Sequence, residues 1–310
     1  MVMKKIISIV IFLLISSHTA VAVEKFKFKY NLHENLPKKW ITEFENIMNI
    51  VQEEFPIDEN TNNIVKLAIS RNEPFNIYLW LDTNKDPFPE FKKHGRKYIM
   101  NESCICGDGT KSWMQLKVHK QDLRENISMS YYVVVHEYFH IYQQALSKLL
   151  RKSLSDYNAK WLVEGGATVL GNIYTRQYYG KDTLKNDIQD RKRWKFKKAT
   201  KEPHLYEKHE TSPHKGYDSN YAGSSFILLA FVNELQKKNN ISEEEAFELV
   251  FREFWIQRAK QPSGWNWQTT FKNTFGMTLD EFYERLSKYK RKDLKKILPS
   301  KTLKTQDIFS

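Results

Sequence analysis

The spacing of apolar residues predicts one helix and two strands in the first part of the chain. From Trp40 to Phe55 the apolar residues recur as on one face of a helix, with Pro37 before this segment and Pro56 after it. Residues 75–81 (F-N-I-Y-L-W-L) and 113–118 (W-M-Q-L-K-V) are rich in β-forming side chains. Both segments lie next to turn-forming residues, so we expect two strands there.

After residue 126 the pattern changes to long helical periods. We expect helices at roughly 128–152, 159–179, 218–238, 242–256 and 279–291. Strands early and helices late are typical of an α+β fold. The sequence therefore predicts a mixed α/β subdomain with a small sheet at 23–125, a mainly helical subdomain at 126–290 and a basic C-terminal tail at 291–310.

The N-terminus has the pattern of a secretory signal peptide. Lys4 and Lys5 precede the apolar run I-I-S-I-V-I-F-L-L-I, and Ala20 and Ala22 follow with the spacing of a cleavage site. The alternative is a membrane anchor, but the run has about half the length that spans a bilayer. We expect residues 1–22 to be removed, no transmembrane segment to remain, and the protein to be periplasmic or secreted.

Composition and charge add two points. The chain has 310 residues, of which 41% are hydrophobic, enough for a sizeable core, so global disorder is excluded. The formal net charge is +12, and residues 191–201 (R-K-R-W-K-F-K-K-A-T-K) form a basic run with Trp194 and Phe196. This run is either a solvated loop or a contact for an anionic surface or polymer. Export argues against specific binding of nucleic acid.

Two cysteines lie close together at Cys104 and Cys106, in N-E-S-C-I-C-G-D-G. Export makes a disulfide possible. A metal site would need further cysteine or histidine nearby. We therefore expect either two loop thiols or one local bridge, without a catalytic role.

The segment V-V-V-H-E-Y-F-H-I-Y-Q-Q at 133–144 carries the main chemical signal. His136 and His140 are four residues apart, so both lie on one face of a helix and can present ring nitrogens to one metal ion. Glu137 borders the same point and suits the role of general base in zinc-dependent hydrolysis. The alternative is a His/Glu pair that faces solvent.

A third metal ligand is expected at Glu164, in K-W-L-V-E-G-G-A-T at 160–168. A carboxylate among apolar and small residues usually has a partner. Glu164 shares a face with Ala167, Thr168 and Gly171, whose small side chains allow close packing against the helix of the histidines. The alternative is a glutamate that only begins a helix, where acidic residues are favoured. Together the two motifs predict a Zn²⁺ site at His136, His140 and Glu164.

The combination H-E-Y-F-H … W-L-V-E-G-G-A resembles the gluzincins, the thermolysin-superfamily metallopeptidases with HExxH followed by ExxA or ExxD. The likeness covers about 130–290 and is greatest to peptidase MA-like domains and the helical half of aminopeptidase N-like enzymes. It implies zinc ligands at His136, His140 and Glu164, Glu137 as general base, and a zinc cleft between the two subdomains.

The same resemblance implies a second donor to the oxyanion, a tyrosine in Y-x-x-G. Tyr221 in Y-A-G-S is a near match, with Ser224 in the place of the glycine, and Tyr217, His214 and His209 are alternatives. The amine-binding G-x-M-E-N of aminopeptidases is replaced by Y-I-M-N-E-S at 98–103, so endopeptidase or aminopeptidase action stays open. The strand at 113–118 is the expected edge strand beside the substrate.

These observations predict an exported zinc metallopeptidase that acts on a peptide or protein substrate. Its catalytic residues would be Glu137 and Tyr221. The alternatives are a non-catalytic exported binding protein on the same scaffold, or another zinc hydrolase or toxin. The intact Glu137 favours an enzyme.

Overall fold

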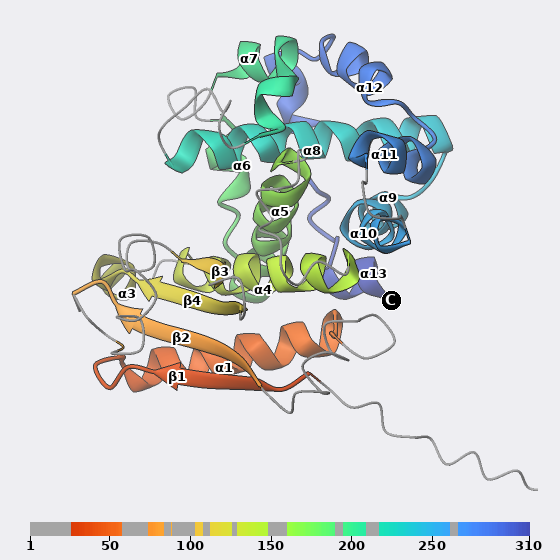
Figure 1. Ribbon diagram of the computed structural model, residues 1–310. Helices are drawn as coiled ribbons and strands as arrows, with labels where there is room; N and C mark the ends of the chain where they lie inside the picture. Colours follow the sequence, from red (N-terminus) through yellow and green to blue (C-terminus); the bar gives the residue numbers. More distant parts are fainter. Residues whose placement is uncertain are drawn as a thin grey trace, which may run out of the picture.

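A small mixed sheet and a larger set of helices make up the described part of the chain in the computed structural model (Figure 1). That part comprises residues 26–57, 74–83, 88, 103–107, 112–125, 129–147, 160–189, 195–208, 217–260 and 266–310. The predicted signal peptide at 1–22 lies outside the described residues. The prediction of strands in the first part of the chain and of helices in the rest is confirmed.

Within the described residues, four strands form the sheet, in the order β1-β2-β4-β3. The strands are β1 (Phe28–Leu32), β2 (Phe75–Leu81), β3 (Cys104–Gly107) and β4 (Ser112–Val118). β1, β2 and β4 are parallel to their neighbours, and β3 is antiparallel to β4. The predictions at 75–81 and 113–118 are confirmed as β2 and β4, whereas β1 and β3 were not predicted.

β4 lies inside the sheet, between β2 and β3. Its residues Trp113 to Leu116 are buried on both faces, which is the pattern of an interior strand. The expectation that 113–118 is an edge strand is therefore wrong. In the described part of the sheet, β3 is the edge strand next to β4.

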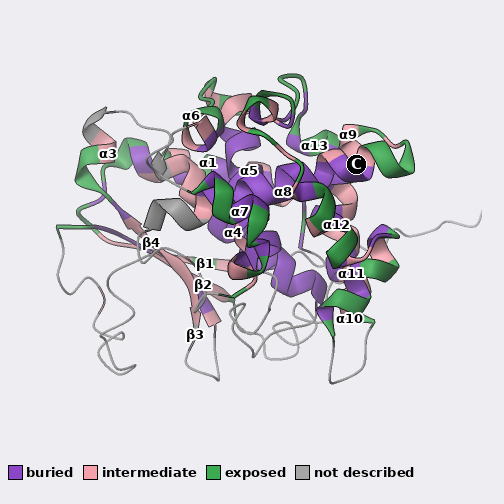
Figure 2. Cartoon of the chain, turned by 90° about the horizontal axis from the view of Figure 1, so that it is seen from above, coloured by how far each residue is buried: buried purple, intermediate pink, exposed green. Residues whose placement is uncertain are grey.

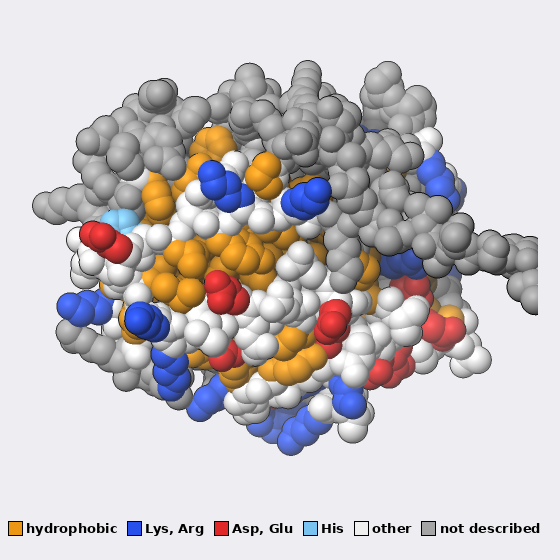
Figure 3. All heavy atoms as spheres, turned by 90° about the horizontal axis from the view of Figure 1, so that it is seen from below, with side chains coloured by type: hydrophobic (Ala, Val, Ile, Leu, Met, Phe, Trp, Pro, Cys, Tyr) orange, Lys and Arg blue, Asp and Glu red, His pale blue; other side chains and the backbone are white. Residues whose placement is uncertain are grey.

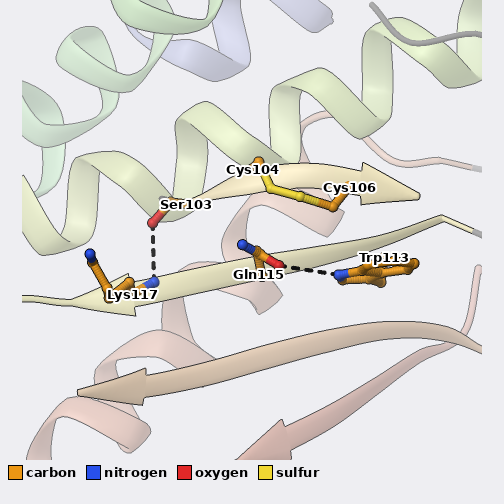
Figure 4. Close-up of a disulfide and its surroundings, with 6 residues drawn as sticks. All are labelled: Ser103, Cys104, Cys106, Trp113, Gln115 and Lys117. Carbon is orange, nitrogen blue, oxygen red and sulfur yellow. Dashed lines mark hydrogen bonds between the residues drawn. A yellow bond between two sulfur atoms is a disulfide. The ribbon is translucent and has the colours of Figure 1, made fainter. Parts of the chain in front are cut away.

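The disulfide between Cys104 and Cys106 lies within β3 (Figure 4). Of the two expectations for these cysteines, the local bridge is confirmed, although it lies in a strand rather than a loop. Both cysteines face the side of the sheet that carries Trp113, because residues two apart in a strand share a face. Ile105 between them packs against the main core on the other side, where α4 lies.

The helices follow the predicted helical segments closely and add several short ones. Those that match predictions are α1 (Lys38–Glu54), α4 (Met129–Ser147), α5 (Lys160–Tyr179) and α8 (Tyr217–Asn239). The helix predicted at 279–291 begins as predicted but ends earlier, as α12 (Leu279–Leu286). The segment predicted at 242–256 is α9 (Glu243–Glu248), a π-helical turn (Leu249–Glu253) and α10 (Phe254–Ala259). The remaining helices are α3 (Lys120–Glu125), α6 (Leu184–Gln189), α7 (Phe196–Lys201), η3 (Pro203–Tyr206), α11 (Trp267–Phe275), η5 (Arg291–Lys295) and α13 (Thr305–Phe309).

α4 is the central helix of the molecule. It contacts α1, β3 and β4 on one side and α5 and α10 on the other. Its residues from Val134 to Ser147 are all buried, so it has no solvent-facing stripe. The Tyr138 hydroxyl donates to the Phe55 carbonyl at 3.3 Å, which fixes α4 to the end of α1. Side chains on α4 are therefore held in place from all sides.

α5 lies between α4 and α8 (Figure 1) and is mostly buried (Figure 2), and its glycines allow both approaches. A Cβ on Gly165 would come 2.6 Å from the Ser224 carbonyl oxygen of α8. A Cβ on Gly171 would come 2.7 Å from the Tyr132 ring of α4. Contacts that short do not occur, so only glycine permits these helix separations. The expected close packing of this helix against the histidine helix is confirmed.

The last twenty residues were expected to be a basic tail, but they pack onto the rest of the chain. Ile308 of α13 is 1% exposed, and the Phe309 ring stacks on Phe55 with centroids 4.8 Å apart. Arg176 of α5 donates to the carbonyls of Pro299 and Leu303. One apolar core cluster therefore includes residues from both ends of the described chain.

The face that carries β1 and α1 has hydrophobic side chains at its centre and charged ones around them (Figure 3). Half-buried Phe28 and Tyr30 of β1 pack against the main core. Exposed Lys29 on the same edge strand places a charge where another strand would pair, which discourages edge-to-edge association. Within the described ranges, no helix is both long and apolar enough to cross a membrane.

Candidate metal centre

His136, His140 and Glu164 meet where α4 contacts α5. The Nε2 atoms of His136 and His140 are 3.1 Å apart. The Glu164 Oε2 atom is 3.4 Å from Nε2 of His136 and 3.5 Å from Nε2 of His140. Both histidines are 5% exposed and the Glu164 side chain is 13% exposed. Two nitrogens and one oxygen therefore converge on one buried point.

α4 and α5 orient the two histidines and Glu164, because both helices are themselves packed against other parts of the fold. His136 and His140 are one turn apart on α4, so their rings project in the same direction. Glu164 lies in the second turn of α5, next to the glycines that bring α5 close to its neighbours. The Trp161 indole donates to the Tyr283 hydroxyl of α12 at 3.1 Å, which fixes the beginning of α5.

The three separations fit one tetrahedral ion. Ligand atoms about 2.0–2.1 Å from zinc, at tetrahedral angles, lie about 3.3 Å from one another. The measured separations are 3.1, 3.4 and 3.5 Å. Two imidazoles and one carboxylate also form the ligand set of catalytic zinc sites that leave a fourth position open. The described residues of this group could therefore hold a metal ion.

The charges of the three groups depend on one another. Burial disfavours the ionised Glu164, but the neighbouring histidines overcome this and hold its pKa well below the usual range. Burial also opposes a charged His140, yet Glu164 raises the pKa of His140 to about 9. Burial lowers the pKa of His136. At neutral pH the carboxylate is ionised and His140 carries the proton that a bound cation would replace.

Metal affinity should rise with pH. Because the pKa of His140 is raised to about 9, metal binding at lower pH must release one proton from this ring. We expect the association constant to increase roughly tenfold per pH unit between about pH 6 and pH 8. Competition with a chelator of known affinity at several pH values measures this. An affinity that does not change with pH would contradict a site built on His140.

Glu137 lies beside the cluster and is itself buried, with 5% exposure. Burial raises the pKa of Glu137 to about 7, although the charge of His140 acts in the opposite direction. The backbone N–H of Ile105 on β3 donates to its carboxylate. A carboxylate with a pKa close to 7 can both accept and return a proton at neutral pH.

Tyr221 lies next to His136. Its ring, in the second turn of α8, is 5.7 Å from the imidazole centroid at an interplanar angle of 71°. Among the four residues expected as possible oxyanion donors, Tyr221 is the one whose side chain can be placed. His209 and His214 lie outside the described residues, and so does the side chain of Tyr217.

Two polar residues that contact the histidines were not predicted. The Tyr132 hydroxyl is 3.1 Å from Nδ1 of His136. The Gln143 Oε1 atom is 2.9 Å from Nδ1 of His140. Positions 132, 136, 140 and 143 are separated by four, four and three residues, so they share one face of α4. This spacing is a signal that could have identified them.

The basic segment at 191–201 is described only from residue 195. Lys195, Lys197, Lys198 and Lys201 are exposed, whereas Phe196 is buried. The centroids of the Phe196 and Phe226 rings are 5.2 Å apart, and the Arg291 guanidinium lies over the Phe196 ring at 5.3 Å. Phe196 is thus part of the core and is not available to stack on a bound polymer.

Neither a family model, nor a curated protein, nor a solved structure matches this chain. The geometry of the cluster and of its neighbours therefore carries the functional argument.

Proposed function

We propose that the protein is a zinc-dependent hydrolase that cleaves peptide bonds, with Glu137 as its general base. The observation that carries this proposal is the convergence of His136, His140 and Glu164 at separations of 3.1–3.5 Å, next to a buried Glu137. A purely structural cluster would have no need for a second carboxylate whose pKa is close to neutrality.

Metal binding and proton transfer would be carried out by different residues of the site. His136, His140 and Glu164 would hold the ion, which supplies Lewis acidity that makes water a stronger acid and polarises a carbonyl group. Glu137 accepts the proton that the attacking water loses, and then donates it to the nitrogen of the leaving amine. Burial of Glu137 raises its pKa to about 7, near the operating pH.

Tyr221 is the proposed second donor to the developing oxyanion. Its ring lies 5.7 Å from that of His136, at the border of the cluster. Replacing it by phenylalanine keeps the ring and removes only the hydroxyl, so kcat should fall about 10²- to 10³-fold. Metal affinity should not change, since the hydroxyl is not among the proposed ligands. An unchanged kcat in the Tyr221→Phe variant would remove Tyr221 from the mechanism.

A peptide is the proposed substrate because H-E-Y-F-H … W-L-V-E-G-G-A at 136–140 and 161–167 resembles the metallopeptidase motifs. The N-terminal pattern at 1–22 supports an exported enzyme that acts in the periplasm or outside the cell. The exposed lysines of α7 are the proposed contact for an anionic surface, without aromatic stacking by Phe196.

Digestion of a peptide library tests the proposal. The purified protein should cleave peptides when loaded with one zinc ion, lose this activity with a chelator, and regain it when zinc is returned. Zinc binding without cleavage of any peptide would favour a non-catalytic binding protein or a hydrolase with another substrate. Cleavage that persists in the metal-free protein would contradict the proposed mechanism.

A further inference from the structure

Gln143 makes two hydrogen bonds that connect the cluster to both helices. The residue follows His140 by three positions on α4, and its side chain is fully buried. Its Oε1 atom is 2.9 Å from Nδ1 of His140. Its Nε2 atom donates to the carbonyl of Val163 on α5 at 3.3 Å. Val163 directly precedes Glu164, so one side chain links two of the proposed ligands.

These contacts determine which nitrogen of His140 carries a proton. The amide nitrogen of a glutamine can only donate and its oxygen can only accept. Because Nε2 of Gln143 is committed to a carbonyl oxygen, Oε1 is left to accept from Nδ1–H of His140. In the neutral ring, Nε2 of His140 then keeps its lone pair and faces Glu164.

The other histidine has a different kind of partner. Nδ1 of His136 contacts the hydroxyl of Tyr132 at 3.1 Å. A hydroxyl can donate or accept, so this contact is compatible with either tautomer of His136. Of the two outer contacts, the one from Gln143 to His140 is therefore the one that selects a tautomer.

The packing around Gln143 leaves little freedom for its amide. A Cβ on Gly166 would lie 3.4 Å from Nε2 of Gln143 and 3.3 Å from the Phe139 ring. The contact to Phe139 is tighter than most contacts of a real Cβ and the contact to Gln143 is at the short end of the ordinary range, so the amide lies close against the backbone of Gly166. The same glycine lets α5 approach α4 at the level of the cluster.

We propose that Gln143 is a positioning residue that holds His140 with Nδ1 protonated and Nε2 free for a metal, and that sets the spacing between His140 and Glu164. This inference rests on the proposed metal site. Outer hydrogen bonds of this kind fix the ring orientation of a metal-binding histidine and increase its basicity, and their loss typically costs 10- to 100-fold in metal affinity.

Three variants separate this role from simple packing. Gln143→Leu removes both hydrogen bonds and should weaken zinc binding about 10- to 100-fold. Gln143→Glu keeps an acceptor for Nδ1–H but loses the donor to the Val163 carbonyl, so its zinc affinity should fall less than that of Gln143→Leu. Gln144→Leu is the matched control, because Gln144 is the next residue on α4, is also buried and is outside the cluster. Its zinc affinity should equal that of the wild type.

Zinc affinity is measured by competition with a chelator, and thermal unfolding of each metal-free variant shows that it is folded. A Gln143→Leu variant with wild-type affinity, or a Gln143→Glu variant that loses as much as Gln143→Leu, would overturn the inference while leaving the metal site intact. Failure of the wild type to bind zinc would instead overturn the proposed function, and this inference with it.

A second measurement needs no variant. In the nitrogen-15 spectrum of the metal-free wild type, at a pH where the His140 ring is neutral, His140 should show a proton on Nδ1 and none on Nε2. A proton on Nε2 of His140 would contradict the role of Gln143.

Discussion

Glu137→Gln is expected to lower the rate of peptide cleavage about 10²- to 10⁴-fold, which is the usual contribution of general acid–base catalysis. The amide has nearly the same shape as the carboxylate but cannot accept the proton of the attacking water. Burial, which raises the pKa of Glu137 to about 7, makes this residue suited to take up and return a proton at neutral pH. Turnover of a peptide identified in the library digest measures the loss.

Metal affinity provides the control for this variant. Glu137 is not one of the three residues whose ligand atoms converge, so Glu137→Gln should bind zinc with about the wild-type stoichiometry. Replacing Glu137 also removes a buried ionisable group and should not destabilise the fold. A variant that still cleaves at the wild-type rate would show that Glu137 is not the base.

Glu164→Gln is expected to weaken zinc binding more than about 100-fold, because even the loss of an outer partner costs 10- to 100-fold. The carboxylate is the one negatively charged group among the three proposed ligands, and its oxygen lies 3.4 and 3.5 Å from the two histidine nitrogens. The amide keeps the size of the side chain but loses the charge that opposes that of the cation. Peptide cleavage should disappear at zinc concentrations that saturate the wild type.

A second buried glutamate serves as the matched control. Glu234 on α8 is 7% exposed and forms ion pairs with Lys237 and Arg285, outside the cluster. Glu234→Gln should destabilise the fold without changing zinc affinity. Equal losses of zinc affinity in both variants would mean that the effect of Glu164→Gln comes from unfolding and not from a lost ligand.

The local part of the site could be predicted from the sequence because a helix converts spacing into geometry. The four-residue separation of His136 and His140 places both on one face of any helix. Glu164 was identified by its apolar and small neighbours, which indicate burial. Gln143 was missed although its three-residue spacing from His140 was available; only its second partner, the Val163 carbonyl on another helix, has no signal in the spacing along the chain.

The sheet shows where local patterns are not sufficient. β2 and β4 are long and rich in β-forming residues, and both were predicted. β1 was missed although apolar and basic residues alternate from Phe26 to Tyr30, a signal that was available. β3 has four residues, two of them cysteines, and its pairing with β4 is non-local. The order of strands depends on such pairing, so the edge position was assigned to the wrong strand.

The packing of the C-terminal residues was not predicted, for a different reason. Their lysines, and the lack of strong periodicity, indicated only a basic tail. Ile308 and Phe309 nevertheless reach the core, and Phe309 stacks on Phe55. A five-residue helix such as α13 gains its stability from this tertiary packing and not from its own periodicity.

The most direct test of the account is the zinc content of the purified chain, compared with that of a His136→Ala/His140→Ala variant after dialysis against metal-free buffer. The account predicts one zinc ion per chain in the wild type and none in the variant, with both proteins folded. A wild type that retains no zinc when it is supplied, or a variant that retains as much as the wild type, would contradict the proposed metal centre.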